Sequence, residues 1–162
     1  MNAMVGGLSG SKMSSSDPDS KVDLLDEAEA VKSKLKKAFC EEGNIIENPI
    51  LQFLKAVVFP VFSLFRADKG EYKFTIKRPE KYGGNVEFSE YEQLERAFAE
   101  KSVHPGDLKA GAADALNELL EPIRQIWASD SALQELTLKA YPPPKPKLVA
   151  EISRVGMLYI SF

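Results

Sequence analysis

The stretch KFTIKRPEKYGGNVEF, residues 73–88, interrupts a sequence that otherwise follows helical patterns. Apolar and polar residues alternate from Tyr72 to Lys77, and this period of two is typical of a half-buried strand. Pro79 and the pair Gly83-Gly84 supply a turn, after which Val86 and Phe88 resume the alternation. Residues 71–88 are therefore expected to form a small β-hairpin.

Two helices are expected before this hairpin. The first begins at Asp26, ends near Gly43 and carries a stripe of apolar residues at helical spacing. The stripe consists of Ala28, Val31, Leu35, Ala38 and Phe39. The second helix starts with Pro49 in its first turn and is apolar on most sides, so it should be buried. Pro60 is expected to bend or stop it, because proline lacks a backbone N–H and clashes with the preceding turn.

Three helices are expected after the hairpin. Ser89 and Glu92 have the spacing of a capping box, which predicts a helix that closes near residues 104–106. Asp107 is expected to be the N-cap of the longest helix, which runs to about residue 127 and contains Pro122. A last helix covers about residues 130–140. The fold class is therefore mainly α, with one small β-hairpin.

Composition limits the classes of function. The chain has 162 residues, of which 44% are hydrophobic, which is enough for one sizeable core. Its formal net charge of −3 argues against binding nucleic acid by bulk positive charge, so any RNA contact must be local. The single Cys40 cannot form an intramolecular disulfide, and the apolar stretch 50–65 is interrupted and too short to span a bilayer. These features favour a reducing, cytosolic setting without a membrane.

Residues 1–25 are rich in glycine, serine and aspartate and are expected to form a mobile loop. This segment contains GSKMSSSDP at residues 10–18. Lys12 lies among glycines and hydroxyl groups, and such a loop can close over a polyphosphate because the lysine supplies charge and the hydroxyls supply donors. Taken alone, the segment is better explained as an ordinary serine-rich linker.

The hairpin carries a local excess of positive charge. Residues 69–82 contain five basic residues, namely Lys69, Lys73, Lys77, Arg78 and Lys81, against the acidic Glu71 and Glu80. Basic side chains interleaved with Tyr72, Phe74 and Tyr82 suit single-stranded RNA, whose bases stack on rings while its phosphates meet cations. The alternative is a solvated hairpin whose aromatic residues face the core.

The turn HPGDLK at residues 104–109 also has two interpretations. Helix capping alone explains Asp107, but a carboxylate at this corner can also accept hydrogen bonds from the Watson–Crick edge of guanine. His104 and Cys40 lie in distant segments and cannot supply the ligands of a metal site, so no metal is expected. The starting motifs of hydrolases, zincins and P-loop proteins are absent from the sequence.

Four blocks, at residues 10–25, 76–84, 104–109 and 120–124, occur in the order found in eukaryotic and archaeal cytosolic tyrosyl-tRNA synthetases, which the chain resembles over residues 1–141. The class I signature of this family, KMSKS, corresponds to Lys12–Ser16 with Ser15 at the second lysine position. The resemblance implies ATP-dependent attachment of tyrosine to tRNA(Tyr) through a tyrosyl-adenylate. Tryptophanyl-tRNA synthetases share the loop and much of the helical architecture, but the block at 76–84 and the turn at 104–107 favour tyrosine.

The resemblance also implies roles for individual residues. The catalytic residues it implies are Lys12, Ser14, Ser15 and Ser16, with Lys12 and Met13 contacting ATP, which carries Mg²⁺. Lys12 would stabilise the pyrophosphate leaving group as charge develops on it. The tRNA anticodon would be bound by Tyr82, which stacks on the first anticodon base, by Asp107, which recognises that base as guanine, and by His104 beside them.

Three regions follow from the resemblance. Residues 1–25 form the signature loop and a linker from the end of the catalytic domain, 26–141 form the helical anticodon-binding domain, and 142–162 form a tail expected to be disordered. Because the Rossmann half is absent from the sequence, we expect a C-terminal fragment that is inactive alone and whose homodimerisation is doubtful. The partners implied for the full-length enzyme are tRNA(Tyr), tyrosine and ATP. A stand-alone tRNA-binding module without catalysis is the alternative.

Overall fold

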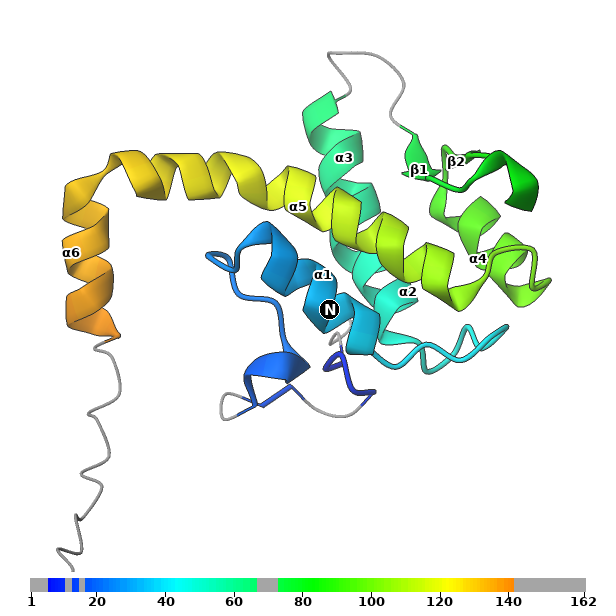
Figure 1. Cartoon of the computed structure of the whole chain (residues 1–162), viewed down its shortest axis with the longest axis horizontal. Coiled ribbons are helices and arrows are strands. Elements are labelled where there is room, and N and C mark those ends of the chain that lie inside the picture. The colour runs from blue at the N-terminus through cyan, green and yellow to red at the C-terminus, as the bar shows by residue number, and fades with distance from the viewer. Residues whose placement is uncertain (1–5, 11–12, 15–16, 67–72, 142–162) are drawn as a thin grey trace, which may run out of the picture. The chain divides into compact units, whose positions relative to one another are not determined.

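The structure is a computed structural model that describes residues 6–10, 13–14, 17–66 and 73–141, and Figure 1 shows its elements. In chain order these are the 3-10 helix η1 (Pro18–Ser20), α1 (Ala28–Lys37), α2 (Pro49–Phe53), the π-helical η2 (Leu54–Val58), α3 (Phe59–Arg66), β1 (Phe74–Ile76), the 3-10 helix η3 (Glu80–Tyr82), β2 (Val86–Phe88), α4 (Tyr91–Ala99), α5 (Pro105–Ser129) and α6 (Ser131–Ala140). Contacts divide the chain into two compact units, residues 1–126 and 127–162. The predicted class, mainly α with one hairpin, is confirmed.

The hairpin forms where the period of two predicted it. Strands β1 and β2 are antiparallel, with Phe74 opposite Phe88 and Ile76 opposite Val86. Phe74 and Ile76 are each only 1% exposed, so the apolar side of the alternation faces the core. The connection between the strands needs glycine, because Gly83 and Gly84 have φ angles of 95° and 71°.

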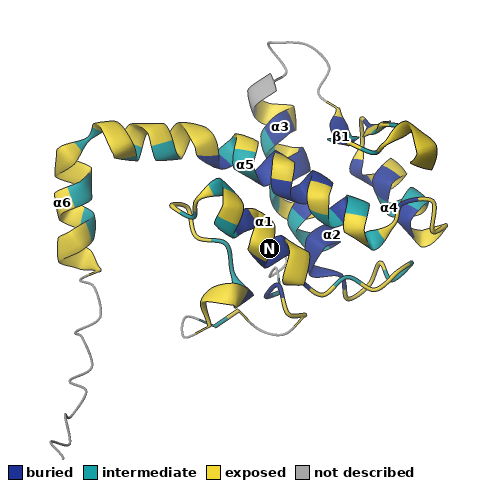
Figure 2. Ribbon diagram, viewed as in Figure 1, coloured by how far each residue is buried: buried dark blue, intermediate teal, exposed yellow. Residues whose placement is uncertain are grey.

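The inner face of the hairpin packs on helix α5 at Gly111. A Cβ atom added to Gly111 would lie 3.1 Å from Cγ1 of Ile76 and 3.2 Å from Cζ of Phe74, so the hairpin side chains would have to shift slightly to admit one. The ring of Phe59 in α3 lies 5.7 Å from that of Phe74 and 5.8 Å from that of Tyr91. The hairpin, α3, α4 and α5 therefore share one core, whose buried residues are dark blue in Figure 2.

Helix α1 runs antiparallel to α5 in the first unit. Arg124 Nε donates a 2.8 Å hydrogen bond to the carbonyl of Asp26, before α1 begins. At the other end of α1, Lys109 Nζ donates to the carbonyl of Lys36 at 3.2 Å. The start of α1 thus lies beside Arg124, late in α5, and its end lies beside Lys109, early in α5. The two helices therefore point in opposite directions.

Pro60 does not stop the second predicted helix. The helix passes from α2 through η2 into α3 and ends at Arg66. The turn before Pro60 is π-helical, because the N–H of Phe59 donates to the carbonyl of Leu54, five residues earlier. A π-turn changes the hydrogen-bond register just before the proline, so the helix absorbs the missing donor locally instead of ending.

The capping box predicted for α4 is wrong. The N-cap is Glu90, which makes no capping hydrogen bond with its side chain. The N–H of Ser89 instead donates to Oε1 of Gln93 at 3.2 Å. The last predicted helix forms as α6, and the Asp130 side chain caps it by accepting from the N–H groups of Ala132 and Leu133.

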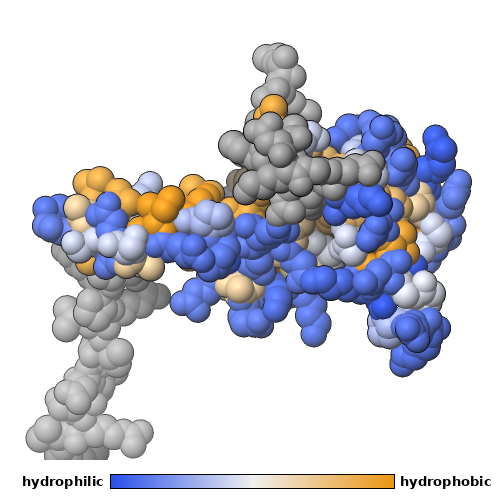
Figure 3. Space-filling model, turned by 90° about the horizontal axis from the view of Figure 1, so that it is seen from above, coloured by the Kyte–Doolittle hydropathy of each residue, from blue (hydrophilic) through white to orange (hydrophobic). Residues whose placement is uncertain are grey.

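Some apolar side chains reach the surface. Along the C-terminal part of α5, Ile123 is 39% and Ile126 61% exposed, and hydrophobic atoms are visible there in Figure 3. Ile123 also lines an apolar cleft of about 550 Å³ together with residues of α2, η2, α3 and α5. Among the described residues, no helix has both the length and the apolar character needed to cross a membrane.

Candidate nucleic-acid interface and signature loop

The segment that contains the predicted phosphate loop is fastened to the core at both ends. Leu8 is buried, its N–H donates to the carbonyl of Ser20 at 2.9 Å, and its carbonyl accepts from the N–H of Phe39 at 2.7 Å. Ser20 is buried, and its hydroxyl oxygen lies 2.7 Å from the carbonyl oxygen of Asp17 and 3.1 Å from that of Ser14. Leu8 and Ser20, which flank the segment, are therefore held together at one point of the core.

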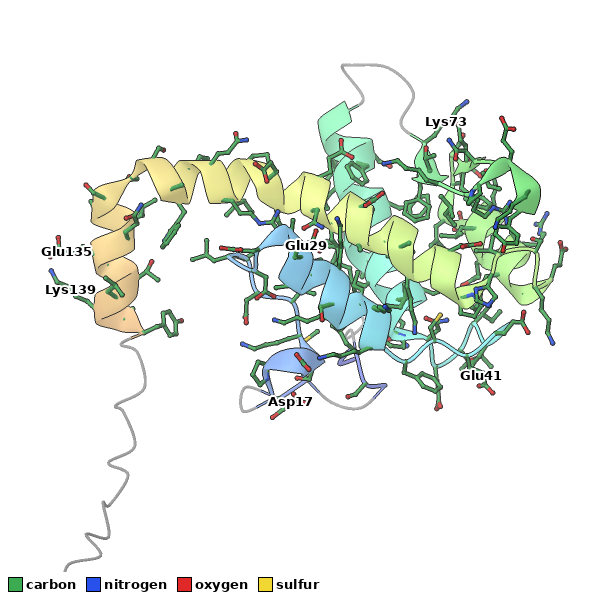
Figure 4. The ribbon with its side chains drawn as sticks, viewed as in Figure 1. Asp17, Glu29, Glu41, Lys73, Glu135 and Lys139 are labelled. Carbon is green, nitrogen blue, oxygen red and sulfur yellow. The ribbon has the colours of Figure 1, made fainter. Side chains whose placement is uncertain are left out.

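This segment is also tied to α1 by charge. Asp17, labelled in Figure 4, caps η1 by accepting from the N–H of Asp19 at 3.1 Å. The carboxylate of Asp19 in turn lies 2.9 Å from Nζ of Lys37, in the last turn of α1. Of the predicted ATP-site residues, Met13 is exposed and Ser14 half-buried. Lys12, Ser15 and Ser16 lie outside the described residues.

The aromatic residues of the hairpin divide between core and surface. Phe74 is buried, as the solvated-hairpin interpretation expected, but Tyr82 is 64% exposed at the end of η3. Nζ of Lys81 lies 4.8 Å from the centroid of the Tyr82 ring. Tyr82 is thus an accessible stacking surface beside a cation, a combination that suits a nucleic-acid base. Tyr72 lies outside the described residues.

Arg78 joins the Tyr82 turn to the segment that leads into α5. Its Nε donates to the carbonyl of Gly84 at 3.2 Å, and its Nη1 donates to the carbonyl of Ser102 at 3.4 Å. Its own backbone N–H donates to Oδ1 of Asn85 at 3.1 Å. The sequence indicated Arg78 only as one of several basic residues. The contact with Ser102, 24 residues away, has no local sequence signal.

His104, not Asp107, caps helix α5. Nδ1 of His104 accepts from the N–H of Gly106 at 3.0 Å, and the His104 carbonyl accepts from the N–H groups of Asp107 and Leu108. Pro105 is the first helical residue, a position that suits proline because no hydrogen bond to its nitrogen is needed there. The predicted N-cap role of Asp107 is therefore wrong.

Because His104 caps α5, the Asp107 side chain is available for another partner. Asp107 is half-buried in the first turn of α5, where the helix dipole favours a negative charge. No described residue donates a side-chain or backbone hydrogen bond to its carboxylate in the part of the chain that the structure covers. The carboxylate can therefore accept hydrogen bonds from a ligand at this corner.

A cleft of about 560 Å³ opens beside this corner, between α1 and α5. Its lining consists of Lys32, Lys36, His104, Pro105, Gly106, Lys109, Ala110, Ala113 and Asp114. Lys32 lies 3.0 Å from the carboxylate of Glu29, whose hydrogen bond and charge raise the pKa of Lys32. The Asp114 carboxylate lies 3.2 Å from Nζ of Lys77, outside the cleft. Sequence analysis missed this cleft, because its two walls are far apart in the chain.

The single cysteine lies beside Asn48 and is partly buried. Burial raises the pKa of the Cys40 thiol, whose Sγ accepts from Nδ2 of Asn48 at 3.3 Å. The thiol is therefore neutral near pH 7, and the neutral form is a poor nucleophile. No group of three or more candidate metal ligands occurs among the described residues.

Comparisons with known proteins agree with the sequence motifs. The model of the family described as "tRNA synthetases class I (W and Y)" matches residues 1–121. The cytoplasmic tyrosine–tRNA ligase of Gallus gallus is 54% identical, over 93% of this chain and 27% of its own length. The corresponding ligase of Saccharomyces cerevisiae is 47% identical, over 98% of this chain and 41% of its own length. The chain thus spans less than half the length of these relatives.

A solved structure shows the same relationship. The crystal structure of tyrosyl-tRNA synthetase complexed with L-tyrosine from Archaeoglobus fulgidus is 38% identical, with a TM-score of 0.66 over 75% of this chain and 35% of that one. The family match covers the signature loop, the hairpin and most of α5. Both curated relatives are named tyrosine–tRNA ligases. The chain therefore belongs to the class I tRNA synthetases, on their tyrosyl-tRNA synthetase branch.

Proposed function

We propose that this chain is the part of an ATP-dependent tyrosine–tRNA ligase that supplies the pyrophosphate loop and recognises the anticodon of tRNA(Tyr). The names of its relatives support tyrosine as the amino acid and the cytoplasm as the location. Tyrosine, ATP with its Mg²⁺, and a second subunit would be partners of a chain of the relatives' full length. Tryptophan as the amino acid has no support among the relatives named above.

Anticodon recognition is supported by the corner that Arg78 holds together. Tyr82 offers an exposed ring on one side, and Asp107 offers a carboxylate without a described partner on the other. In the proposed complex the first anticodon base stacks on Tyr82, and its guanine N–H groups donate to Asp107. His104 fixes the first turn of α5 from which Asp107 extends. The observation that carries this proposal is the half-buried Asp107 carboxylate, which does not cap α5 and has no hydrogen-bond donor among the described residues.

In the proposed reaction, Lys12 stabilises the negative charge that develops on the pyrophosphate leaving group of ATP, while hydroxyl and amide groups of residues 13–16 donate to its oxygens. The hydrogen bond from the N–H of Leu8 to the carbonyl of Ser20 supports a loop with a fixed base. The ATP itself would be bound mainly by residues that the relatives carry beyond the matched part.

The test measures binding of the whole chain to an anticodon stem-loop of tRNA(Tyr), with guanine or adenine as the first anticodon base. We expect the chain to prefer guanine by about 1–3 kcal/mol, as for other lost base contacts. Asp107→Ala should abolish this preference. Tyr82→Ala should weaken the binding of both RNAs alike by about 1–3 kcal/mol. Tyr82→Phe should bind both RNAs like the unsubstituted chain, because it keeps the stacking surface.

Tyr141→Ala is the matched control, because Tyr141 is an exposed tyrosine that follows α6. It should leave both affinities unchanged. Anticodon recognition by this corner is refuted if Asp107→Ala keeps the guanine preference and Tyr82→Ala binds as tightly as the Tyr141→Ala chain.

A further inference from the structure

We propose that the cleft between α1 and α5 binds the sugar–phosphate backbone of RNA next to the anticodon; this inference rests on the function proposed above. The cleft begins at the His104–Gly106 turn, which is also the turn that positions Asp107. RNA whose first anticodon base reaches Asp107 must continue past this turn. The neighbouring nucleotides therefore come within reach of the cleft.

The charges around the cleft fit a polyanion. Lys32 and Lys36 are four residues apart and lie on the same side of α1, and Lys109 faces them from α5. The one carboxylate in the lining, Asp114, lies 3.2 Å from Nζ of Lys77, and Lys32 is paired with Glu29 at 3.0 Å. Neither Lys36 nor Lys109 has such a carboxylate partner among the described residues. The cleft is thus a local concentration of positive charge on a chain whose net charge is −3.

Lys36 is the most available of these cations. It is exposed, and no described residue forms an ion pair with its ammonium group. Lys109 is held at the cleft, because its Nζ donates to the carbonyl of Lys36 at 3.2 Å. The exposed ammonium group of Lys36 and the fixed ammonium group of Lys109 can therefore contact two successive phosphates.

The apolar residues of the lining suit a ribose. Pro105, Ala110 and Ala113 present small apolar surfaces between the lysines. The volume of about 560 Å³ lies within the range of roughly 300–1,000 Å³ that is usual for ligand sites. Apolar surfaces beside cations match the alternation of sugar and phosphate along an RNA strand.

The experiment measures the affinity of the whole chain for the same stem-loop as a function of salt. Each phosphate contact steepens the fall of log K with log salt by about 0.7–0.9, so one contact accounts for about a threefold change between 50 and 200 mM salt. Lys36→Gln should remove one such contact, and Lys32→Gln together with Lys36→Gln should remove up to two. The loss should be equal for RNAs with guanine or adenine as the first anticodon base.

Lys139→Gln is the control, because Lys139 is an exposed lysine of α6 whose Nζ lies 2.7 Å from Oε1 of Glu135. Figure 4 labels both residues. The Lys139→Gln chain should keep the slope of the unsubstituted chain. A second measurement needs no substitution: bound stem-loop should protect Lys32 and Lys36 from acetylation more strongly than Lys139.

The two proposals fail in different ways. If Asp107→Ala abolishes the guanine preference while Lys36→Gln keeps the full salt slope and Lys36 is not protected, the cleft does not bind RNA and anticodon recognition stands. If no stem-loop binds, or if neither Asp107→Ala nor Tyr82→Ala changes binding, the proposed function is wrong and the inference about the cleft is wrong with it.

Discussion

Arg78 shows how a single residue can organise a site without being its chemical group. Its guanidinium is planar and donates in two directions, to Gly84 in the hairpin turn and to Ser102 before α5. Lysine cannot reproduce this fork, because its ammonium is a single point charge on a flexible stem. Arg78 is therefore a positioning residue, which sets where Tyr82 lies relative to the first turn of α5.

Substitution of Arg78 tests this role. Arg78→Ala should weaken stem-loop binding by about 1–2 kcal/mol, because two hydrogen bonds from a charged donor are lost. It should also speed amide hydrogen exchange at Gly83 and Gly84. Arg78→Lys should restore little of either property, although it keeps the charge. If Arg78→Lys binds like the unsubstituted chain, charge and not the fork is what matters. Arg96→Ala, at an exposed arginine of α4, is the control.

At the scale of elements, the local patterns predicted where helices and strands lie better than how they begin. Val31 and Leu35 recur at helical spacing and are buried as expected, and the period of two placed Phe74 and Ile76 inside. The capping predictions failed where several polar residues compete for the same donors. Gln93 accepts in place of the predicted Ser89 pair, and His104 caps where Asp107 was expected.

Tertiary contacts account for the other features that the sequence could not predict. The helix continues through Pro60 while Phe59, just before it, packs against the rings of the hairpin and α4. Tyr91 is held there as well, with its pKa raised by burial and by its hydrogen bond to Glu95. Likewise, Lys36 and Lys109 meet across 73 residues. The signature motifs indicated the candidate base-binding residues, but no short pattern indicated the basic cleft.

The contact between α5 and the hairpin gives a prediction for these two elements. Gly111→Val should lower the free energy of unfolding by about 1–3 kcal/mol, because the added methyl groups would overlap Phe74 and Ile76. Gly111→Ala should cost less, since alanine improves helix propensity by about 1 kcal/mol. Urea denaturation measures both. Ala110→Val, at the exposed neighbouring position, should cost under about 1 kcal/mol; an equal loss at positions 110 and 111 would contradict the close packing.

At the scale of the whole molecule, the chain carries two segments with separate proposed chemistry on one core. The signature loop is fastened at Leu8 and Ser20, and the anticodon corner is built from the hairpin and α5. The chain spans less than half the length of its relatives. Its sequence motifs were enough to predict the family, whereas the placement of Lys12 lies outside the described residues.

This division predicts where activity can be measured. The chain alone should show no tyrosine-dependent exchange between ATP and pyrophosphate. In a chain of the relatives' full length, Lys12→Ala should reduce the exchange rate by about 10²–10³, the usual effect of losing one preorganised charge contact. Lys21→Ala, just after the loop, should have a far smaller effect. Equal losses at positions 12 and 21 would show that the loop acts through its overall charge and not through Lys12.

The last turn of α1 connects two regions that have been described separately. Lys36 lines the basic cleft, while its neighbour Lys37 is paired with Asp19 at the base of the signature loop. Consecutive residues of a helix are separated by a rise of about 1.5 Å and share one rigid turn. A molecule that contacts Lys36 in the cleft therefore lies one residue away from the ion pair that ties the Asp19 segment to α1.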